Sequence, residues 1–141
     1  MIRGTYATPN PGATMGYPAE RQRDLAVSAL ASTIGREHIR LSYEYLNRRD
    51  VEGYASLVDP MARFRGPGPC LARGPQAAAE LLIGLLPETS THTLHRIVIE
   101  DGQAAASGTL TTADSTRHDF VDFFSISDHG LLLSWRRFLS A

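Results

Sequence analysis

The sequence lacks lysine, because all 14 of its basic residues are arginine. Together with the many alanines, we interpret this bias as the mark of a GC-rich genome rather than as a phosphate-binding design. The formal net charge is only −1. This charge gives no reason to expect binding to nucleic acid or to an acidic membrane surface.

Cysteine is almost absent too, since Cys70 is the only one and no internal disulfide can form. We interpret Cys70 as a small loop residue rather than a nucleophile. No apolar run approaches the length of a membrane span, and the N-terminus lacks the basic-then-apolar order of a signal peptide. We therefore expect a cytoplasmic protein that does not bind membranes.

Motifs for cofactors and metals are missing as well. The chain has no glycine-rich phosphate loop, no nucleophile elbow and no zinc-ligand spacing. His92 and His95 are three residues apart on a predicted strand, so their side chains face opposite sides and are unsuited to one metal ion. We predict a protein that uses neither a metal nor an organic cofactor.

What is present suits one globular domain. The 141 residues are 43% hydrophobic and 21% charged, which is ordinary for such a domain. Residues 1–18 are rich in proline and glycine and are predicted to form a flexible tail. Residues 19–141 are predicted to form a single domain.

The first half of this domain has helical periodicity. Helices are predicted over residues 19–34 and 36–49, and Gly35 either breaks or merely bends the segment between them. Asp50 is a suitable N-cap for a short following helix. A further helix is predicted over Gln76–Leu86, which ends before a proline.

The second half alternates with a period of two. After a short strand at Met61–Arg65, strands are predicted over His92–Glu100, Gln103–Thr112 and, as a hairpin, residues 116–139. Helices ahead of a meandering antiparallel sheet predict an α+β fold, in which three N-terminal helices cap a curved, cone-shaped sheet. The small residues of 103–112 either leave a cavity inside the cone or allow close packing.

Asp122 is the main functional clue. On an extended strand it shares a face with His118, Phe120 and Phe124. A carboxylate between aromatic side chains must be paired, protonated or used in chemistry.

The partner of Asp122 depends on the hairpin register. A two-residue turn at His129-Gly130 would place Asp122 opposite Arg137, with Leu133 and Trp135 on the same face. A slip of one residue would bring Arg136 there instead. The first register is favoured because it keeps the apolar side chains inside.

The other face of the predicted sheet is also apolar. It carries Val121 and Phe123, with Ile97 and Ile99 as candidates beside them. A sheet that is apolar on both sides must be covered on both, so we predict a homodimer through the outer sheet face.

Several segments, in order, resemble one superfamily. They are Tyr45–Tyr54 (YLNRRDVEGY), Ala62–Pro67 (ARFRGP), Arg73-Gly74, Val121–Phe124 (VDFF) and Asp128–Gly130 (DHG). Over about residues 36–139 the chain resembles the nuclear transport factor 2-like (NTF2-like) superfamily, and in particular the SnoaL-like polyketide cyclases and the ketosteroid isomerases. The resemblance implies the cone-shaped α+β fold.

For the site, this resemblance implies a role for Asp122. It falls where ketosteroid isomerases keep a protonated Asp that donates a hydrogen bond to an enolate, and near the Asp that SnoaL-like cyclases use as acid and base. The catalytic base of the isomerases would fall on Gly66 and their helix-borne tyrosine on Ser42, so steroid isomerisation is not implied. Limonene-epoxide-hydrolase relatives have an Arg where Phe120 stands and a second Asp on the following strand, which is missing here.

We therefore predict a cofactor-independent cyclase or isomerase that acts on a hydrophobic, carbonyl-containing, polyketide-like metabolite, as in antibiotic biosynthesis. The alternatives are a non-catalytic module that binds such a ligand and an interaction domain with a filled interior. Asp122 is the predicted catalytic residue, with His95 and His118 as further proton carriers. The predicted substrate-binding residues are Tyr43, Tyr54, Phe64, Phe120, Phe124, Leu133, Trp135 and Arg137.

Overall fold

The computed structural model describes residues 19–140, so the predicted flexible tail at 1–18 lies outside the described residues. Within that range no helix is long and apolar enough to cross a membrane. The helices are α3 (Ala19–Arg48), α4 (Val51–Ala55) and α5 (Pro75–Leu85). The strands are β1 (Val58–Arg65), β2 (Leu71–Arg73), β3 (Thr91–Glu100), β4 (Gln103–Thr111), β5 (Arg117–Ile126) and β6 (Leu132–Leu139).

Helix α3 is continuous through Gly35, where the sequence predicted either a break or a bend. Gly35 is buried, and a β-carbon there would come within 2.8 Å of the Ile126 side chain. The glycine thus allows the end of β5 to pack closely on the helix. The short helix α4 starts as predicted, because the Asp50 carboxylate accepts a hydrogen bond from the backbone N–H of Gly53.

The six strands form one sheet in the order β2-β1-β6-β5-β4-β3. All neighbouring strands are antiparallel except β1 and β6, which run parallel. The sequence predicted a wholly antiparallel sheet and missed β2, a strand of only three residues. Strand β1 also begins at Val58, three residues earlier than predicted.

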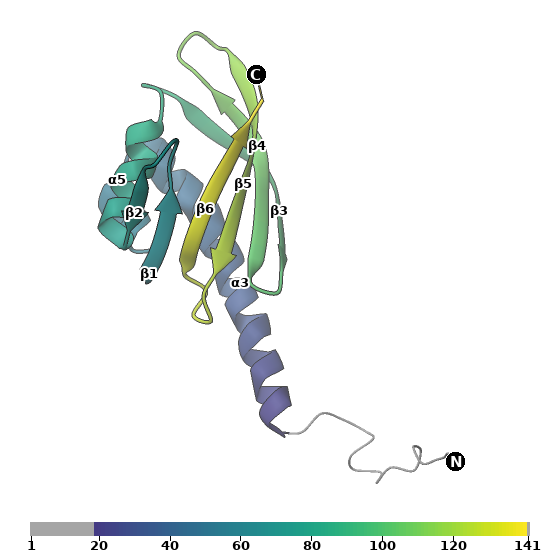
Figure 1. Ribbon diagram of the computed structural model, residues 1–141. Coiled ribbons are helices and arrows are strands. Elements are labelled where there is room, and N and C mark those ends of the chain that lie inside the picture. The colour runs from purple at the N-terminus through teal and green to yellow at the C-terminus, as the bar shows by residue number, and fades with distance from the viewer. Residues whose placement is uncertain (1–18, 141) are drawn as a thin grey trace.

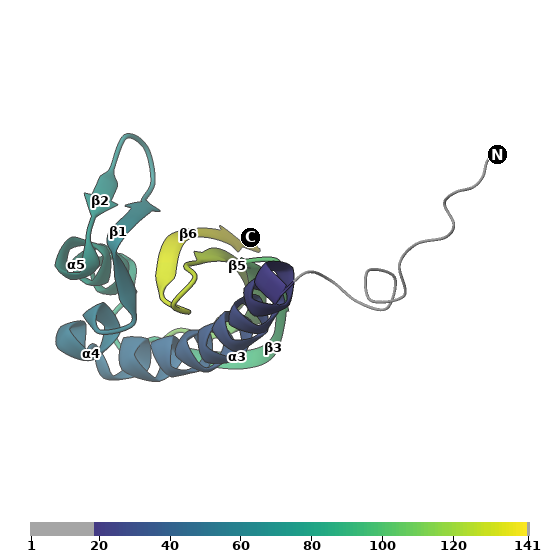
Figure 2. The same ribbon diagram turned by 90° about the horizontal axis from the view of Figure 1, so that it is seen from below.

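Figure 2 shows that the sheet is strongly curved and that the helices lie on its concave side, while Figure 1 shows α3 crossing behind β3, β5 and β6. Buried side chains from the helices and from the concave face, among them Ile39, Leu82, Phe64 and Phe124, form one core. The α+β cone predicted from the sequence is confirmed.

Two β-bulges change which side chains face inward. On β3, Leu94 pairs with Gly108 and Arg96 with Ser107, so His95 has no partner and is exposed. Beyond this bulge Ile97 and Ile99 pack against the core. Their predicted place on the outer face is therefore wrong.

The second bulge lies on β6, where Ser134 pairs with Ser125 and Leu132 with Ile126. Leu133 is the extra residue, and Leu132 is the fully buried one. The prediction that Leu133 shares the face of Asp122 is wrong, because it assumed strict alternation through the hairpin.

The small residues of β4 serve close packing rather than a cavity. Ala104 and Ala106 are buried opposite Phe124 and Asp122. A β-carbon on Gly108 would come within 2.2 Å of the Thr93 carbonyl oxygen and 2.8 Å of the Phe120 ring. Of the two alternatives for this strand, a cavity or close packing, the structure shows close packing.

Candidate functional site

The centre of the concave face holds a buried ion pair. Asp122 is fully buried, and it lies opposite Arg137, as the favoured hairpin register predicted. Arg137 donates from Nε to Asp122 Oδ1 at 2.7 Å and from Nη2 to Oδ2 at 2.8 Å. The hydroxyl of Tyr43 donates to the same Oδ2 at 2.7 Å. Both carboxylate oxygens thus act as acceptors, and the guanidinium supplies the counter-charge.

His92 completes this cluster, although its position in the sequence did not predict a place in the site. Arg137 Nη2 lies 2.9 Å from His92 Nε2. Because arginine can only donate, Nε2 is the acceptor and Nδ1 carries the proton, which faces Asn47 Oδ1 at 3.3 Å. Burial, together with the positive charges of Arg137 and Arg49, lowers the pKa of His92 to about 3. His92 is therefore neutral over the physiological range.

The phenol of Tyr43 is held in its protonated form. Burial, and then the charge and hydrogen bond of Asp122, raise its pKa well above the ordinary value. Burial raises the pKa of Tyr54 in the same direction. The Tyr54 hydroxyl and the indole N–H of Trp135 are buried without a hydrogen-bond partner in the part of the chain that the structure describes.

Only some of the N–H donors of Arg137 take part in the hydrogen bonds described above. Its guanidinium group has five N–H bonds, and three of them are used by Asp122 and His92. The two on Nη1 have no acceptor among residues 19–140. Burial lowers the pKa of Arg137, but the hydrogen bonds and charge of Asp122 outweigh it and the net shift is upward. The side chain therefore stays a cation although only 15% of it is exposed.

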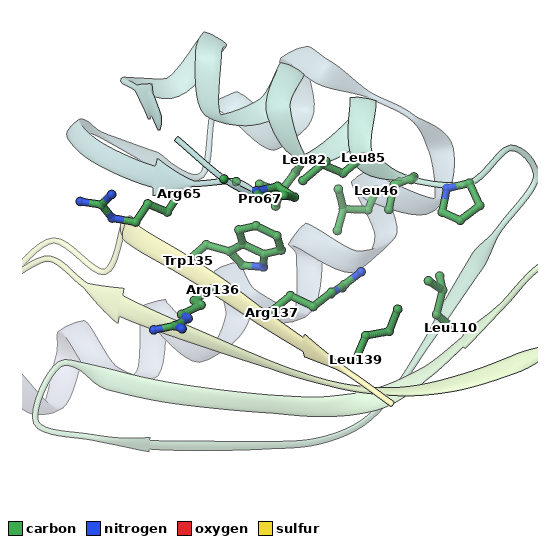
Figure 3. A pocket seen from close by; sticks show the side chains of 14 residues that line it. Leu46, Arg65, Pro67, Leu82, Leu85, Leu110, Trp135, Arg136, Arg137 and Leu139 are labelled. Carbon is green, nitrogen blue, oxygen red and sulfur yellow. The ribbon is translucent and has the colours of Figure 1, made fainter. Parts of the chain in front are cut away.

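A cavity of about 710 Å³ lies next to this cluster, between α5 and the C-terminal half of β6. In Figure 3, Arg137 extends into it toward Leu46, Leu110 and Leu139. Asp122 is not among the lining residues, so the cavity contacts the arginine and not its carboxylate. The lining residues are Leu46, Arg65, Gly66, Pro67, Gly68, Leu82, Leu85, Leu86, Pro87, Leu110, Trp135, Arg136, Arg137 and Leu139.

Of the predicted site residues, Trp135 and Arg137 line this cavity. The structure brings Tyr43 and Phe120 into the cluster behind it, since the Phe120 ring lies 5.5 Å from Tyr43 and 4.7 Å from the guanidinium carbon of Arg137. Phe64 stacks on Trp135 from β1. These aromatic side chains support the cavity from behind, as do two further buried predictions, Tyr54 and Phe124.

Three predicted residues lie elsewhere. His95 is exposed at the bulge of β3, and Leu133 lines a separate pocket of about 390 Å³ near the first half of α3. His118 is half-buried opposite Leu110, and its Nδ1 has no partner within residues 19–140. Only His118 of these three has a cross-strand neighbour that lines the large cavity.

Most of the cavity wall was not predicted. The helix at Gln76–Leu86 was predicted without a role in the site, and so was the segment that follows the predicted strand Met61–Arg65. No local sequence pattern marks these residues, because they surround the end of the parallel β1–β6 pairing at Phe64 and Trp135, and these strands are far apart in the chain. Beyond that pair, the cavity is bounded by β6, α5 and the segment after β1.

Comparison with solved structures identifies the fold. A protein from Kribbella flavida DSM 17836, provisionally named a ketosteroid isomerase, is 24% identical over 78% of this chain and 80% of its own, with a TM-score of 0.66. A Mycobacterium tuberculosis epoxide hydrolase of the limonene-epoxide-hydrolase type is 17% identical over 77% and 84%, with a TM-score of 0.62. An NTF2-like protein from Mesorhizobium loti is 16% identical over 78% and 93%, also at 0.62.

These likenesses show an NTF2-like fold. No curated protein sequence matches the chain significantly. However, a family model described as the SnoaL-like domain matches residues 39–135. The match begins at the buried Ile39 in α3 and ends at Trp135 in the cavity wall. The chain therefore belongs to the SnoaL-like domain family.

Proposed function

We propose that the chain is a cofactor-independent cyclase or isomerase for a hydrophobic, carbonyl-containing metabolite. The observation that carries this proposal is the pair of N–H donors on Arg137 Nη1, which have no acceptor within residues 19–140 and lie at the wall of a leucine-lined cavity. A carbonyl oxygen bound there would meet a fixed cation in surroundings of low polarity. Such donors stabilise the oxyanion or enolate that forms during ring closure or isomerisation.

The buried cluster supports this role by fixing the guanidinium. Asp122 holds Nε and Nη2, and His92 accepts the remaining N–H of Nη2. Nη1 is thereby left as the part of the group that is free to bind substrate. Positioning of this kind lowers the reorganisation needed when charge develops. We assign Asp122 to this positioning role, and its direct acid–base role stays a prediction.

His118 is our candidate for proton transfer. Its Nδ1 has no partner within residues 19–140, and its cross-strand neighbour Leu110 lines the cavity. Imidazole is the side chain most often used for this task. His95 takes no part in the proposal because it is exposed at a bulge.

The experiment compares Arg137→Gln, Asp122→Asn and Arg96→Gln with the unmodified chain. Each is incubated with a panel of linear poly-β-ketone acids, and ring closure is followed as a new chromatographic peak with aromatic absorbance. We expect Arg137→Gln to lose turnover and Asp122→Asn to lower kcat more than it raises KM. Arg96→Gln, at an exposed arginine of β3 that lines no described cavity, should keep its kcat. Circular dichroism is used to check that each variant is folded. An unchanged kcat in folded Arg137→Gln would refute the mechanism.

The second candidate is a module that binds the same kind of ligand without reaction. It is favoured by the composition of the cavity wall, which contains no His, Asp, Glu, Cys or Tyr among its 14 residues. In that case the unmodified chain would bind members of the panel and convert none of them.

We also propose that the chain pairs with a second copy through the outer sheet face. Val98, Phe123 and Phe138 are each about half-exposed there, and the rings of Phe123 and Phe138 pack edge to face at 5.8 Å. Val98, Ala105 and Phe123 are neighbours across three strands. An apolar strip of this kind favours contact with another surface.

A further inference from the structure

Two arginines at one end of the cavity are not explained by the chemistry proposed so far. Arg65 lies at the end of β1 and Arg136 on β6, and both line the cavity. Figure 3 shows them on the side of Trp135 away from the Arg137 guanidinium, which extends toward Leu110 and Leu139. Both side chains project from the convex side of the sheet, so they form a cationic mouth of the cavity that is separate from the oxyanion-binding position at Arg137.

Neither arginine is neutralised by the protein. Within residues 19–140 the ion pairs join Arg40, Arg48 and Arg137 to carboxylates, and none involves Arg65 or Arg136. Arg136 does place its guanidinium carbon 4.9 Å above the Phe138 ring. That contact uses the face of the group and leaves its N–H edges free to donate.

The same side chains also border a groove on the outside. A pocket of about 300 Å³ is lined by Arg63, Arg65 and Arg136 and shares Trp135 with the large cavity. Among residues 19–140, no carboxylate lines either space. A ligand that fills the inner cavity can therefore reach this end, where it meets positive charge and no negative charge.

We propose that the substrate carries a carboxylate, which is bound between Arg65 and Arg136 while its carbonyl lies at Arg137. This inference rests on the proposed function and names its substrate class: hydrophobic keto acids rather than neutral ketones or esters. Two guanidinium groups match a carboxylate because each can donate two parallel N–H bonds to its oxygens. A carboxylate at this end also fixes which carbonyl of a multi-ketone chain reaches Arg137.

The test uses 6-phenylhexanoic acid and its neutral amide as probes. Binding is measured by calorimetry and by the emission of Trp135, which is the only tryptophan in the chain and lines the cavity. Because both arginines are exposed, we expect the acid to bind about 3- to 10-fold more tightly than the amide at low salt. The preference should shrink as the salt concentration rises.

The double variant Arg65→Gln/Arg136→Gln should lose this preference and still bind the amide. The control variant Arg96→Gln/Arg117→Gln removes the same number of positive charges from exposed residues of β3 and β5 that line no described cavity. Equal binding of acid and amide by the unmodified chain would overturn the inference and leave the proposed function standing. A preference that survives in the double variant would also overturn it, since the carboxylate would then bind at Arg137. Failure of both probes to bind would count against the cavity and therefore against both proposals.

Discussion

Two neighbouring arginines on β6 have opposite surroundings. Arg137 points to the concave face, where it bonds to Asp122 and His92. Arg136 points to the convex face, is exposed, and places its guanidinium over the Phe138 ring. The two side chains are chemically identical, so the difference between them is made entirely by the pleat of the strand.

The contrast separates two roles that an arginine can have in this fold. Removing a cation such as Arg137 from water is costly, and the surrounding acceptors are what make its burial tolerable. A cation such as Arg136 costs little to place and is free to bind whatever arrives from solvent. A residue of the first kind suits a fixed catalytic position, and one of the second suits recognition.

The largest expected effect comes from removing the counter-charge on the concave face. Asp122→Ala leaves the buried Arg137 guanidinium without its counter-charge and Tyr43 without its acceptor. We expect the free energy of unfolding to fall by about 3–5 kcal/mol, measured by urea denaturation followed by circular dichroism. Arg136→Ala on the other face should change it by less than about 0.5 kcal/mol. Similar losses in the two variants would show that the pleat does not divide the two roles as described.

The next effect comes from pH, is again confined to the concave face, and is smaller for a change of one pH unit. The pKa of His92 is lowered to about 3 in the folded chain, from an ordinary value of 6.5. Between these values the unfolded chain binds the proton more readily, so stability is complete above pH 6.5 and is lost as the pH falls toward 3. His92 alone contributes a slope of up to about 1.4 kcal/mol per pH unit.

Urea denaturation at a series of pH values measures that slope. His92→Gln should flatten it, whereas His129→Gln, in the exposed turn before β6, should leave it unchanged. A slope that is the same in His92→Gln and in the unmodified chain would remove His92 from the buried cluster.

The smallest effect on stability is expected on the convex face. Phe123 is 48% exposed, so Phe123→Ser should change the unfolding free energy of the monomer by less than about 1 kcal/mol. The same substitution should convert the proposed dimer to a monomer in light scattering at micromolar concentration. Leu30→Ser removes an exposed apolar side chain from α3 and should leave the dimer intact. A monomeric unmodified chain would end the dimer proposal.

The sequence was sufficient for the cone and for the pairing of Asp122 with Arg137. The predicted two-residue turn at His129-Gly130 is wrong, because Ile126 pairs with Leu132 across a longer turn and the extra residue Leu133 restores the predicted register at Arg137. Sequence prediction failed wherever a strand has an extra residue. The bulge at His95 moved Ile97 and Ile99 to the inner face, and the bulge at Leu133 replaced it with Leu132. Nothing in the composition of either strand marks these positions.

The cavity was harder still to predict. Its walls come from α3, α5, β6 and the segment after β1, which are far apart in the sequence. Of the aromatic residues expected to line it, only Trp135 does so. The others are buried in the core, since large side chains on a concave face pack on one another first. His92 was likewise missed because a partner so distant in the chain leaves no local pattern.

The position of β6 also has a consequence for folding. It is the last strand along the chain, yet it lies in the middle of the sheet and joins the β1–β2 pair to the β3–β5 meander. Until β6 docks, both β1 and β5 present open edges that can pair with other chains. Its pairing with β1 spans about 70 residues and must overcome a large loop-closure entropy, so completing the sheet is expected to be a late and slow event in folding.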